Sequence, residues 1–249
     1  MNMPGYGRST MFLKILTLVT VIMAVLSTGS LVAGEIEEKF SSLEGWEALE
    51  FPKIDRHTEY SIVSSVESEA GGSLLRAQAD ASASGLIFKS TFDIAETPFV
   101  EWRWKVEGTV TGGDASKKEG DDYASRIYII FPYDPKEASF GTRLKYNAAR
   151  LIYGEYPPLG SLNYIWANRE HSQKVIPNAF TSQAMMFPVD TGREHVGQWR
   201  SYRVDIRADY IEAFGEDPPA TASLAIMSDT DNTGESATAY IDYIRVVGE

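Results

Sequence analysis

Residues 99–107 (FVEWRWKVE) constrain the fold more than any other stretch of the chain. Apolar side chains alternate with charged ones, which places Trp102, Trp104 and Val106 on one face and the charged residues Glu101, Arg103, Lys105 and Glu107 on the other. This period of two predicts a β-strand with one buried face and one solvated face. Indole rings can also stack on sugars, but two tryptophans opposite a fully charged face are typical of a β-sandwich interior.

Similar short segments recur along the chain, separated by turn residues. We expect strands at residues 46–51, 61–68, 73–79, 85–93, 99–107, 123–131, 161–167, 183–187, 199–206, 221–227 and 237–247. Helical spacing of apolar residues predicts one helix within 138–153, and residues 207–214 are expected to form a helical turn that Gly215 ends. One helix cannot supply the crossovers of a parallel sheet. The sequence therefore predicts an all-β fold, an antiparallel β-sandwich of the jelly-roll type (galactose-binding-like or concanavalin-like) with one inserted helix.

The first 34 residues differ from the rest and predict a signal peptide. Arg8 and Lys14 give a positive start, and an uncharged apolar run follows at 15–26. Small residues come after this run, and residues 32–34 offer a cleavage site before Glu35. The alternative is an uncleaved anchor, although the polar run STGS interrupts the span that a bilayer requires. We expect a signal peptide at 1–34, a single domain at 35–249, a periplasmic or secreted location, and no membrane span after cleavage.

Composition excludes several classes of function. The chain contains no cysteine, so it has neither a disulfide nor a thiol nucleophile. The formal net charge is −12, and it becomes −14 without residues 1–34, which hold two basic residues and no acidic one. Such an acidic protein is not expected to bind nucleic acid or anionic membranes, because both favour clustered lysine and arginine. The zinc motif H-E-x-x-H and the nucleophile motif G-x-S-x-G are also absent from the sequence.

Residues 117–131 (KKEGDDYASRIYIIF) place a guanidinium in the middle of an apolar strand. Alternation puts Arg126 on one face with Ala124 and Tyr128, and Asp121 and Asp122 directly precede the strand. A buried arginine needs carboxylate or carbonyl partners. Two hypotheses follow: an ion pair that stabilises the fold, with Asp122 as the partner of Arg126, or an arginine that faces a ligand.

A second strand, at residues 161–167, carries aromatic residues at alternate positions. Tyr164, Trp166 and Asn168 are expected on one side. If that side lines a groove with Arg126, it offers aromatic surface together with amide and guanidinium donors, which suits polyhydroxylated ligands. The alternative is core packing. The predicted ligand-binding residues are Asp121, Asp122, Arg126, Tyr128, Tyr164 and Trp166.

The acidic loop at 229–235 begins like a calcium loop, with oxygen-bearing side chains at alternate positions and glycine at the sixth. An EF-hand is excluded, because Tyr240 stands where a bidentate glutamate would belong. Several hard oxygens in a short turn still suit a cation, so we predict Asp229, Asp231 and Asp242 as metal ligands. Calcium is the one cofactor that the sequence suggests; the alternative is an ordinary loop between strands.

Mixed polar and aromatic runs span nearly all of residues 35–249. They are Trp102 with Trp104, residues 120–126, residues 162–167, Trp199, residues 209–210, residues 214–215 and residues 225–233. In these runs the chain resembles the bacterial domain of unknown function 3047 family. The resemblance implies an exported, jelly-roll-like domain without an established activity, and it marks the D-D-Y-x-x-R and D-x-D-N runs as the polar signatures of that family.

Three functional hypotheses remain open. The first is a cell-envelope sandwich that binds carbohydrate or another polar ligand. The second is a polysaccharide lyase or hydrolase centred on Asp121, Asp122 and Arg126, although a glycosidase needs two carboxylates across the scissile bond and the sequence does not pair them. The third is a structural or protein-interaction module. Because no catalytic signature is complete, binding is the function that the sequence favours.

Overall fold

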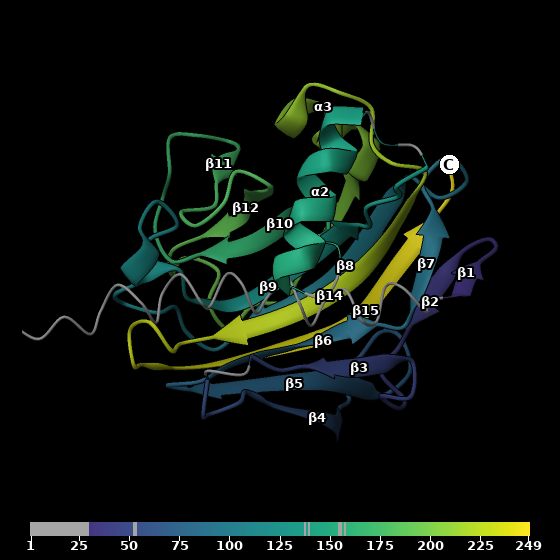
Figure 1. Ribbon diagram of the computed structural model, residues 1–249. Helices are drawn as coiled ribbons and strands as arrows, with labels where there is room; N and C mark the ends of the chain where they lie inside the picture. The colour runs from purple at the N-terminus through teal and green to yellow at the C-terminus, as the bar shows by residue number, and fades with distance from the viewer. Residues whose placement is uncertain (1–29, 52–53, 137, 139, 154–155, 157) are drawn as a thin grey trace, which may run out of the picture.

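The computed structural model describes residues 30–51, 54–136, 138, 140–153, 156 and 158–249. Two β-sheets pack face to face, and two α-helices lie outside them (Figure 1). The predicted all-β sandwich is confirmed. The described part of the chain has two α-helices where one was predicted. The second forms because the helical turn expected at 207–214 is long enough to be a helix of its own.

The larger sheet has nine strands. Its order from one edge is β1 (Ser30–Val32), β7 (Ser90–Asp93), β14 (Thr221–Asp229), β9 (Tyr123–Phe131), β10 (Gly160–Ala167), β12 (Ala184–Thr191) and β11 (Ile176–Pro177), with β6 (Ala83–Phe88) also paired to β14 and β3 (Trp46–Leu49) paired to β6. Two pairs, β10 with β12 and β1 with β7, are parallel. The other strand pairs of the described residues are antiparallel, as predicted; β10 and β12 run parallel because the long connection after β10 returns the chain to the same end of the sheet.

The smaller sheet has six strands. Its order is β13 (Arg200–Asp205), β8 (Phe99–Val106), β15 (Ser236–Val247), β5 (Ser73–Asp80) and β4 (Glu59–Ser64), with β2 (Ile36–Glu38) paired to β15. The strand predicted at 85–93 is two strands, because its halves pair with separate stretches of β14. The strands β1, β2 and β11 were not predicted, since a segment of two or three residues carries no readable alternation.

The main hydrophobic core lies between the two sheets. Trp102 and Trp104 of β8 are fully buried there. The ring centroid of Trp102 lies 5.2 Å from that of Tyr164 in the opposite sheet, and the ring centroid of Trp104 lies 6.2 Å from that of Trp166. The core interpretation of residues 99–107 is confirmed. Arg103, expected on a solvated face, is only 7% exposed, because it packs against Trp199 and binds Asp242.

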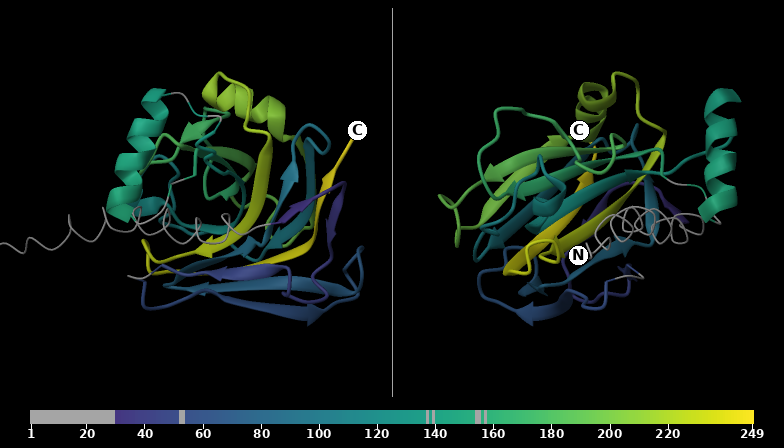
Figure 2. Two further views of the ribbon diagram at one scale, coloured as in Figure 1. Left: turned by 45° about the vertical axis from the view of Figure 1, so that its right-hand side comes forward. Right: turned by 60° about the vertical axis from the view of Figure 1, so that its left-hand side comes forward.

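The two helices differ in how they join the sandwich. In α3 (Ile206–Phe214), Asp205 caps the first turn by accepting from two backbone N–H groups, and Gly215 ends the helix at φ 75°. Helix α2 (Phe140–Tyr153) stands at the periphery in both views of Figure 2. The helix predicted within 138–153 is confirmed, and its Phe140 and Leu144 are exposed.

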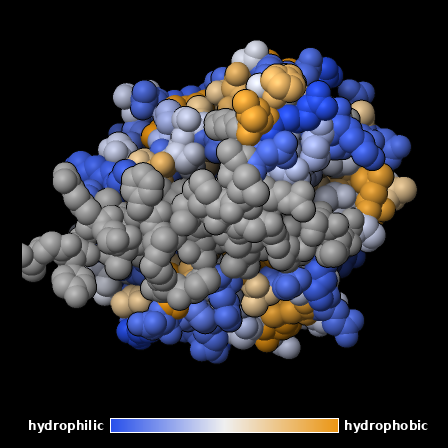
Figure 3. All heavy atoms as spheres, in the orientation of Figure 1, coloured by the Kyte–Doolittle hydropathy of each residue, from blue (hydrophilic) through white to orange (hydrophobic). Residues whose placement is uncertain are grey.

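Polar side chains dominate the described surface in Figure 3, and the apolar patches on that face are small and separate. Among the described residues, neither helix has the length and apolar character that crossing a bilayer requires.

We expect Trp104→Ala to lower the free energy of unfolding by about 3 to 5 kcal/mol, because it leaves a large cavity in the core between the sheets. Denaturant unfolding would measure the loss. Val66→Ala is the control, since Val66 is fully exposed and its change is expected to stay within about 0.5 kcal/mol. An equal effect of both substitutions would contradict the assigned core.

The cleavage predicted before Glu35 would remove β1, whose first two side chains are exposed. We therefore expect a chain that begins at Glu35 to be less stable than one that begins at Ser30 by under about 1 kcal/mol. A chain that begins at Phe40 also loses β2 with the buried Ile36, and it should lose about 2 kcal/mol more. Thermal unfolding of the three chains tests this order.

Candidate functional site

A groove lies on the outer face of the nine-stranded sheet, the face directed away from the six-stranded sheet. Its cavity volume is about 170 Å³. The apolar part of its lining includes Phe51, Ile54, Tyr128, Ile130, Phe180 and Met227. The polar part includes Asp121, Arg126, Asn163, Asn178, Asp229, Asp231 and Asn232. The groove thus combines an apolar floor with a polar end.

Strand β9 separates the groove from the core by alternation of its side chains. Ile127 and Ile129 belong to the core between the sheets, whereas Tyr128 and Ile130 belong to a separate cluster on the groove side. Arg126 lines the groove with them. The prediction that Arg126 and Tyr128 share a face is confirmed.

The alternation breaks at the start of β9, contrary to the sequence prediction. Ala124 packs in the core between the sheets, while the ring of Tyr123 lies 4.7 Å from the guanidinium carbon of Arg126. The cause is a β-bulge, seen as a register shift between Met227 and Asp229 of β14, which faces this part of β9. The bulge brings Tyr123 to the side of Arg126.

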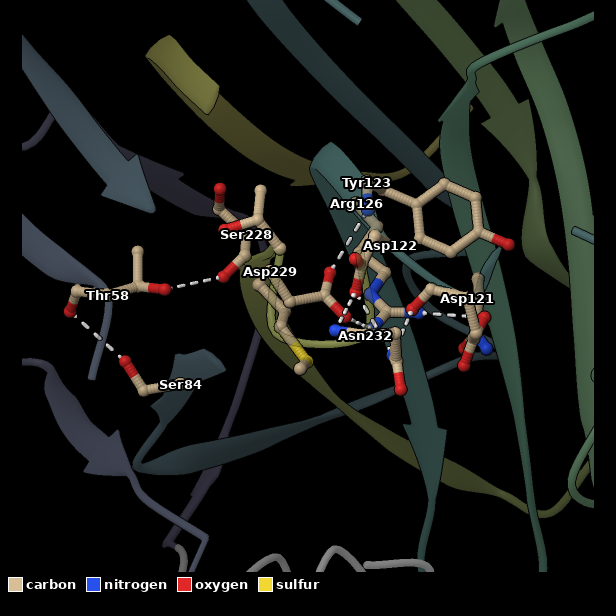
Figure 4. Close-up of polar contacts among 12 residues, drawn as sticks. Thr58, Ser84, Asp121, Asp122, Tyr123, Arg126, Ser228, Asp229 and Asn232 are labelled. Atoms are coloured by element: carbon tan, nitrogen blue, oxygen red, sulfur yellow. Dashed lines mark hydrogen bonds and ion pairs between the residues drawn. The ribbon is translucent and has the colours of Figure 1, made fainter. Parts of the chain in front are cut away.

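Arg126 is the centre of the polar end and is only 3% exposed (Figure 4). Its guanidinium forms a direct ion pair with Asp229 and lies 3.5 Å from a carboxylate oxygen of Asp121. The rings of Tyr123 and Tyr128 flank it. Its Nε has no hydrogen-bond partner among the described residues.

Burial and charge shift the pKa values of these groups. Burial raises the pKa of Asp229 well above its usual value; Arg126 opposes that rise, and the carboxylates of Asp122, Asp121 and Asp231 reinforce it. Burial also raises the pKa of Tyr128, so its hydroxyl stays protonated. The rise for Asp229 thus reflects several acidic groups gathered around one guanidinium in a buried place.

Asp122 has a different role from the one predicted. It is fully buried and accepts hydrogen bonds from the backbone N–H groups of Asn232, at 3.2 Å, and Thr233, at 2.7 Å. These bonds hold the loop between β14 and β15 against the start of β9. The predicted pairing of Arg126 with Asp122 was wrong, because Asp122 faces that loop and Asp229 takes its place as the partner of the guanidinium.

Tyr164 and Trp166 lie on the other face of the sheet from Arg126. Both are fully buried between the sheets; Tyr164 donates to Asp209 and Trp166 donates to the carbonyl of Gly192. The predicted common face was wrong, because the antiparallel register of β9 and β10 pairs Tyr164 with Ile127, which faces the core. The open alternative, core packing, is what the structure shows.

The sequence prediction missed two amides that line the groove. Asn163 of β10 stands directly opposite Tyr128 in the register and is 1% exposed. Asn178, from the loop after β11, lies 3.3 Å from both carboxylate oxygens of Asp121. An amide inside the apolar run GSLNYIWA was the available signal for Asn163. The sequence gives no such signal for Asn178, because only the path of its loop brings it to the groove.

The predicted metal ligands separate into two places. Asp229 and Asp231 form a cluster with Asp122, in which one carboxylate oxygen from each lies within 4.8 Å of the others. Asp242 is bound instead to Arg103, Ser68 and the N–H of Glu69 on the six-stranded sheet. Asp242 was a wrong prediction, because the chain changes sheets between β14 and β15. Calcium at the remaining cluster stays a prediction. In that cluster Arg126 already supplies Asp229 with a positive charge.

The comparison with protein families adds an identification. The family described as a protein of unknown function (DUF3047) matches residues 44–245. The chain belongs to this family. The resemblance expected from the D-D-Y-x-x-R and D-x-D-N runs is confirmed, and these runs of the DUF3047 chain supply Asp121, Arg126, Asp229 and Asp231 of the groove. A search of curated proteins finds no match.

Solved structures resemble the DUF3047 chain at low identity. A family 11 carbohydrate-binding module from Clostridium thermocellum, in complex with a mixed-linked tetrasaccharide, is 12% identical with a TM-score of 0.38, over 87% of this chain and 97% of that one. A lectin from Bauhinia forficata in complex with GalNAc is 12% identical with a TM-score of 0.39, over 85% and 97%. The Crh5 transglycosylase in complex with NAG is 14% identical with a TM-score of 0.42, over 89% and 86%. A likeness of this degree concerns the fold alone.

We expect Arg126→Met to lower the free energy of unfolding by about 3 to 5 kcal/mol, because it leaves Asp229 buried without its partner. The loss should grow as the pH rises. Without the guanidinium the pKa of Asp229 rises further, and a carboxyl with a raised folded-state pKa destabilises increasingly between its unfolded and folded pKa values. Denaturant unfolding at several pH values measures both effects.

Arg203→Met is the matched control, because Arg203 pairs with Glu101 at the surface. Its loss is expected to stay below about 1 kcal/mol. A loss for Arg126→Met that does not change with pH would contradict the role given to Asp229.

Proposed function

We propose that the groove of this DUF3047 protein binds a carbohydrate or a closely related polar small molecule. The observation that carries the proposal is the groove itself, an apolar floor that ends in polar side chains, two of which have hydrogen-bonding atoms without a partner among the described residues. Pockets that combine apolar walls with a few convergent polar groups are the usual form of a ligand site.

The apolar part of the groove suits the carbon-bound hydrogens of a sugar ring. Tyr128 and Ile130 form the floor on β9, and Met227 extends it on β14. Phe51 and Phe180 come from loops on either side, so aromatic rings stand at the edges. Aromatic side chains provide a large apolar contact area at a small cost in conformational entropy.

The polar part supplies hydrogen-bonding capacity that the described residues leave unused. Within the part of the chain that the structure describes, Asn163 donates from Nδ2 only to the sulfur of Met186, which is a weak acceptor, and its Oδ1 has no partner. Arg126 Nε also has no hydrogen-bond partner among the described residues. Buried polar groups are normally satisfied, so a ligand with several hydroxyl groups would complete what the fold leaves open.

Export to the periplasm or beyond is part of this proposal, and it rests on the signal segment predicted at residues 1–34. Hydrolysis or elimination by the same groove residues stays a hypothesis, which the release of product from a bound glycan would test.

The test measures binding by calorimetry and by thermal unfolding, against neutral, acidic and amino oligosaccharides. A ligand at about 100 times its dissociation constant should stabilise the protein by about 2.7 kcal/mol. Phe180→Ala should weaken binding about tenfold or more without a comparable loss of stability, because Phe180 is a half-buried loop residue of the groove.

Phe140→Ala is the matched control, since Phe140 is 80% exposed on α2 and does not line the groove. Its affinity should equal that of the unmodified protein. The proposal fails if no saccharide binds, or if both phenylalanine variants bind a saccharide with unchanged affinity.

A further inference from the structure

The groove is lined differently on the two sides of β9. It crosses β6, β14, β9 and β10, which are successive neighbours in the sheet. One side, called the apolar side, is formed by β6, β14 and the segment after β3 through Phe51, Ile54, Ala83 and Met227. The other side, called the amide side, carries Asn163 of β10 and Asn178 from the loop after β11.

The groove is wider than one sugar ring. Neighbouring strands lie about 4.8 Å apart, so the distance from β6 to β10 is about 14 Å across three spacings. Tyr128 stands between the two sides, on β9. A single ring placed on Tyr128 leaves part of this width uncovered. A ligand that fills the groove therefore has one part on each side.

The amide side suits hydroxyl groups. The Nδ2 of Asn163 lies 3.2 Å from the sulfur of Met186, which leaves its Oδ1, an acceptor, without a partner among the described residues. The buried Nε of Arg126, a donor, also lacks a partner there. A sugar hydroxyl both donates and accepts, so adjacent hydroxyls can meet both atoms. Asn178 is already engaged, because its amide donates to Asp121 and accepts from the N–H of Phe180.

The apolar side suits a hydrocarbon group. Phe51, Ala83 and Met227 belong to a hydrophobic cluster that is separate from the core between the sheets, and Ile54 packs against it while remaining half-buried. The sulfur of Met227 is the one hydrogen-bonding atom among these four side chains, and it is a weak acceptor. Sugar hydroxyls placed here would lose their bonds to water without replacement, whereas a hydrocarbon group gains free energy from burial.

We propose, building on the carbohydrate-binding function above, that the natural ligand is a glycoside whose sugar carries an apolar group. The sugar lies on Tyr128 and directs hydroxyls to Asn163 Oδ1 and Arg126 Nε. The apolar group fills the apolar side, against Ile54 and Met227.

The experiment measures binding of methyl, butyl, hexyl and octyl β-glucosides and β-galactosides, each below the concentration at which it forms micelles. Calorimetry should show the affinity for one of the two sugars rising about fourfold with each added methylene until the apolar side is filled, and then staying constant. 1-Hexanol, which has the chain without the sugar, should bind at least about tenfold more weakly than the hexyl glycoside.

Two variants separate the two parts of the ligand. Ile54→Thr puts a hydroxyl on the apolar side, so it should lower the gain per methylene to about twofold or less while leaving the affinity for the methyl glycoside unchanged. Asn163→Leu should weaken every member of the series by the same factor, about tenfold or more. Its melting temperature should not fall, because the substitution removes a buried amide oxygen that lacks a partner among the described residues.

The matched controls lie on α2, outside the groove. Leu144→Thr changes an exposed apolar residue and Asn147→Leu an exposed amide, and both variants should bind the whole series as the unmodified protein does.

Four results would overturn the inference. Equal affinity for the methyl and the octyl glycosides, with an oligosaccharide bound, removes the apolar group and leaves the carbohydrate-binding function in place. Loss of the chain-length gain in Leu144→Thr, or its persistence in Ile54→Thr, places the chain elsewhere on the protein. Unchanged affinity of Asn163→Leu removes the sugar from the amide side. Absence of binding by every glycoside and every oligosaccharide removes the proposed function and the inference together.

Discussion

The ion pair between Arg126 and Asp229 is the interaction on which the rest of the groove depends. It links β9 to the last residue of β14, both at the centre of the nine-stranded sheet. Its partners lie close on every side: Asp121 just before β9, Tyr123 at the bulge and Tyr128 two residues further along the strand. A buried pair of this kind is costly to break and adds little net stability over an apolar core. Its position in a groove therefore accords with a role in recognition as well as in folding.

The bulge in β9 gives this pair its surroundings. In a regular strand Tyr123 would point into the core between the sheets, and Ala124 would stand beside Arg126. The extra residue reverses both, so an aromatic ring covers the guanidinium and a small side chain enters the core. The loop after β14 then folds back over the start of β9, and Asp122 fixes it through backbone N–H groups. Two stretches about a hundred residues apart in the chain thus form one polar end.

The groove also depends on which face of each strand the register selects. Strand β10 carries both a good core face, with Tyr164 and Trp166, and a polar position, Asn163. Its antiparallel pairing with β9 sets Asn163 opposite Tyr128, which directs the amide outward and the two aromatic residues inward. A slip of one residue would exchange them. The aromatic residues that looked most like a sugar-stacking platform therefore stabilise the sandwich instead, and the groove takes its aromatic rings from Tyr128 and from loops.

The fold class, most strands and the common face of Arg126 and Tyr128 could be read from the order of residues alone. These are local properties, because alternation of side chains and turn residues act over a few positions. The sequence also located the acidic loop and the arginine as the polar features of the chain. Three outcomes required the folded chain: Asp229, and not Asp122, pairs with Arg126; Asp242 belongs to the other sheet; and Asn163 and Asn178 line the groove. Those outcomes follow from strand pairing, a bulge and the paths of loops, which join residues far apart in the chain and leave no mark in the local pattern.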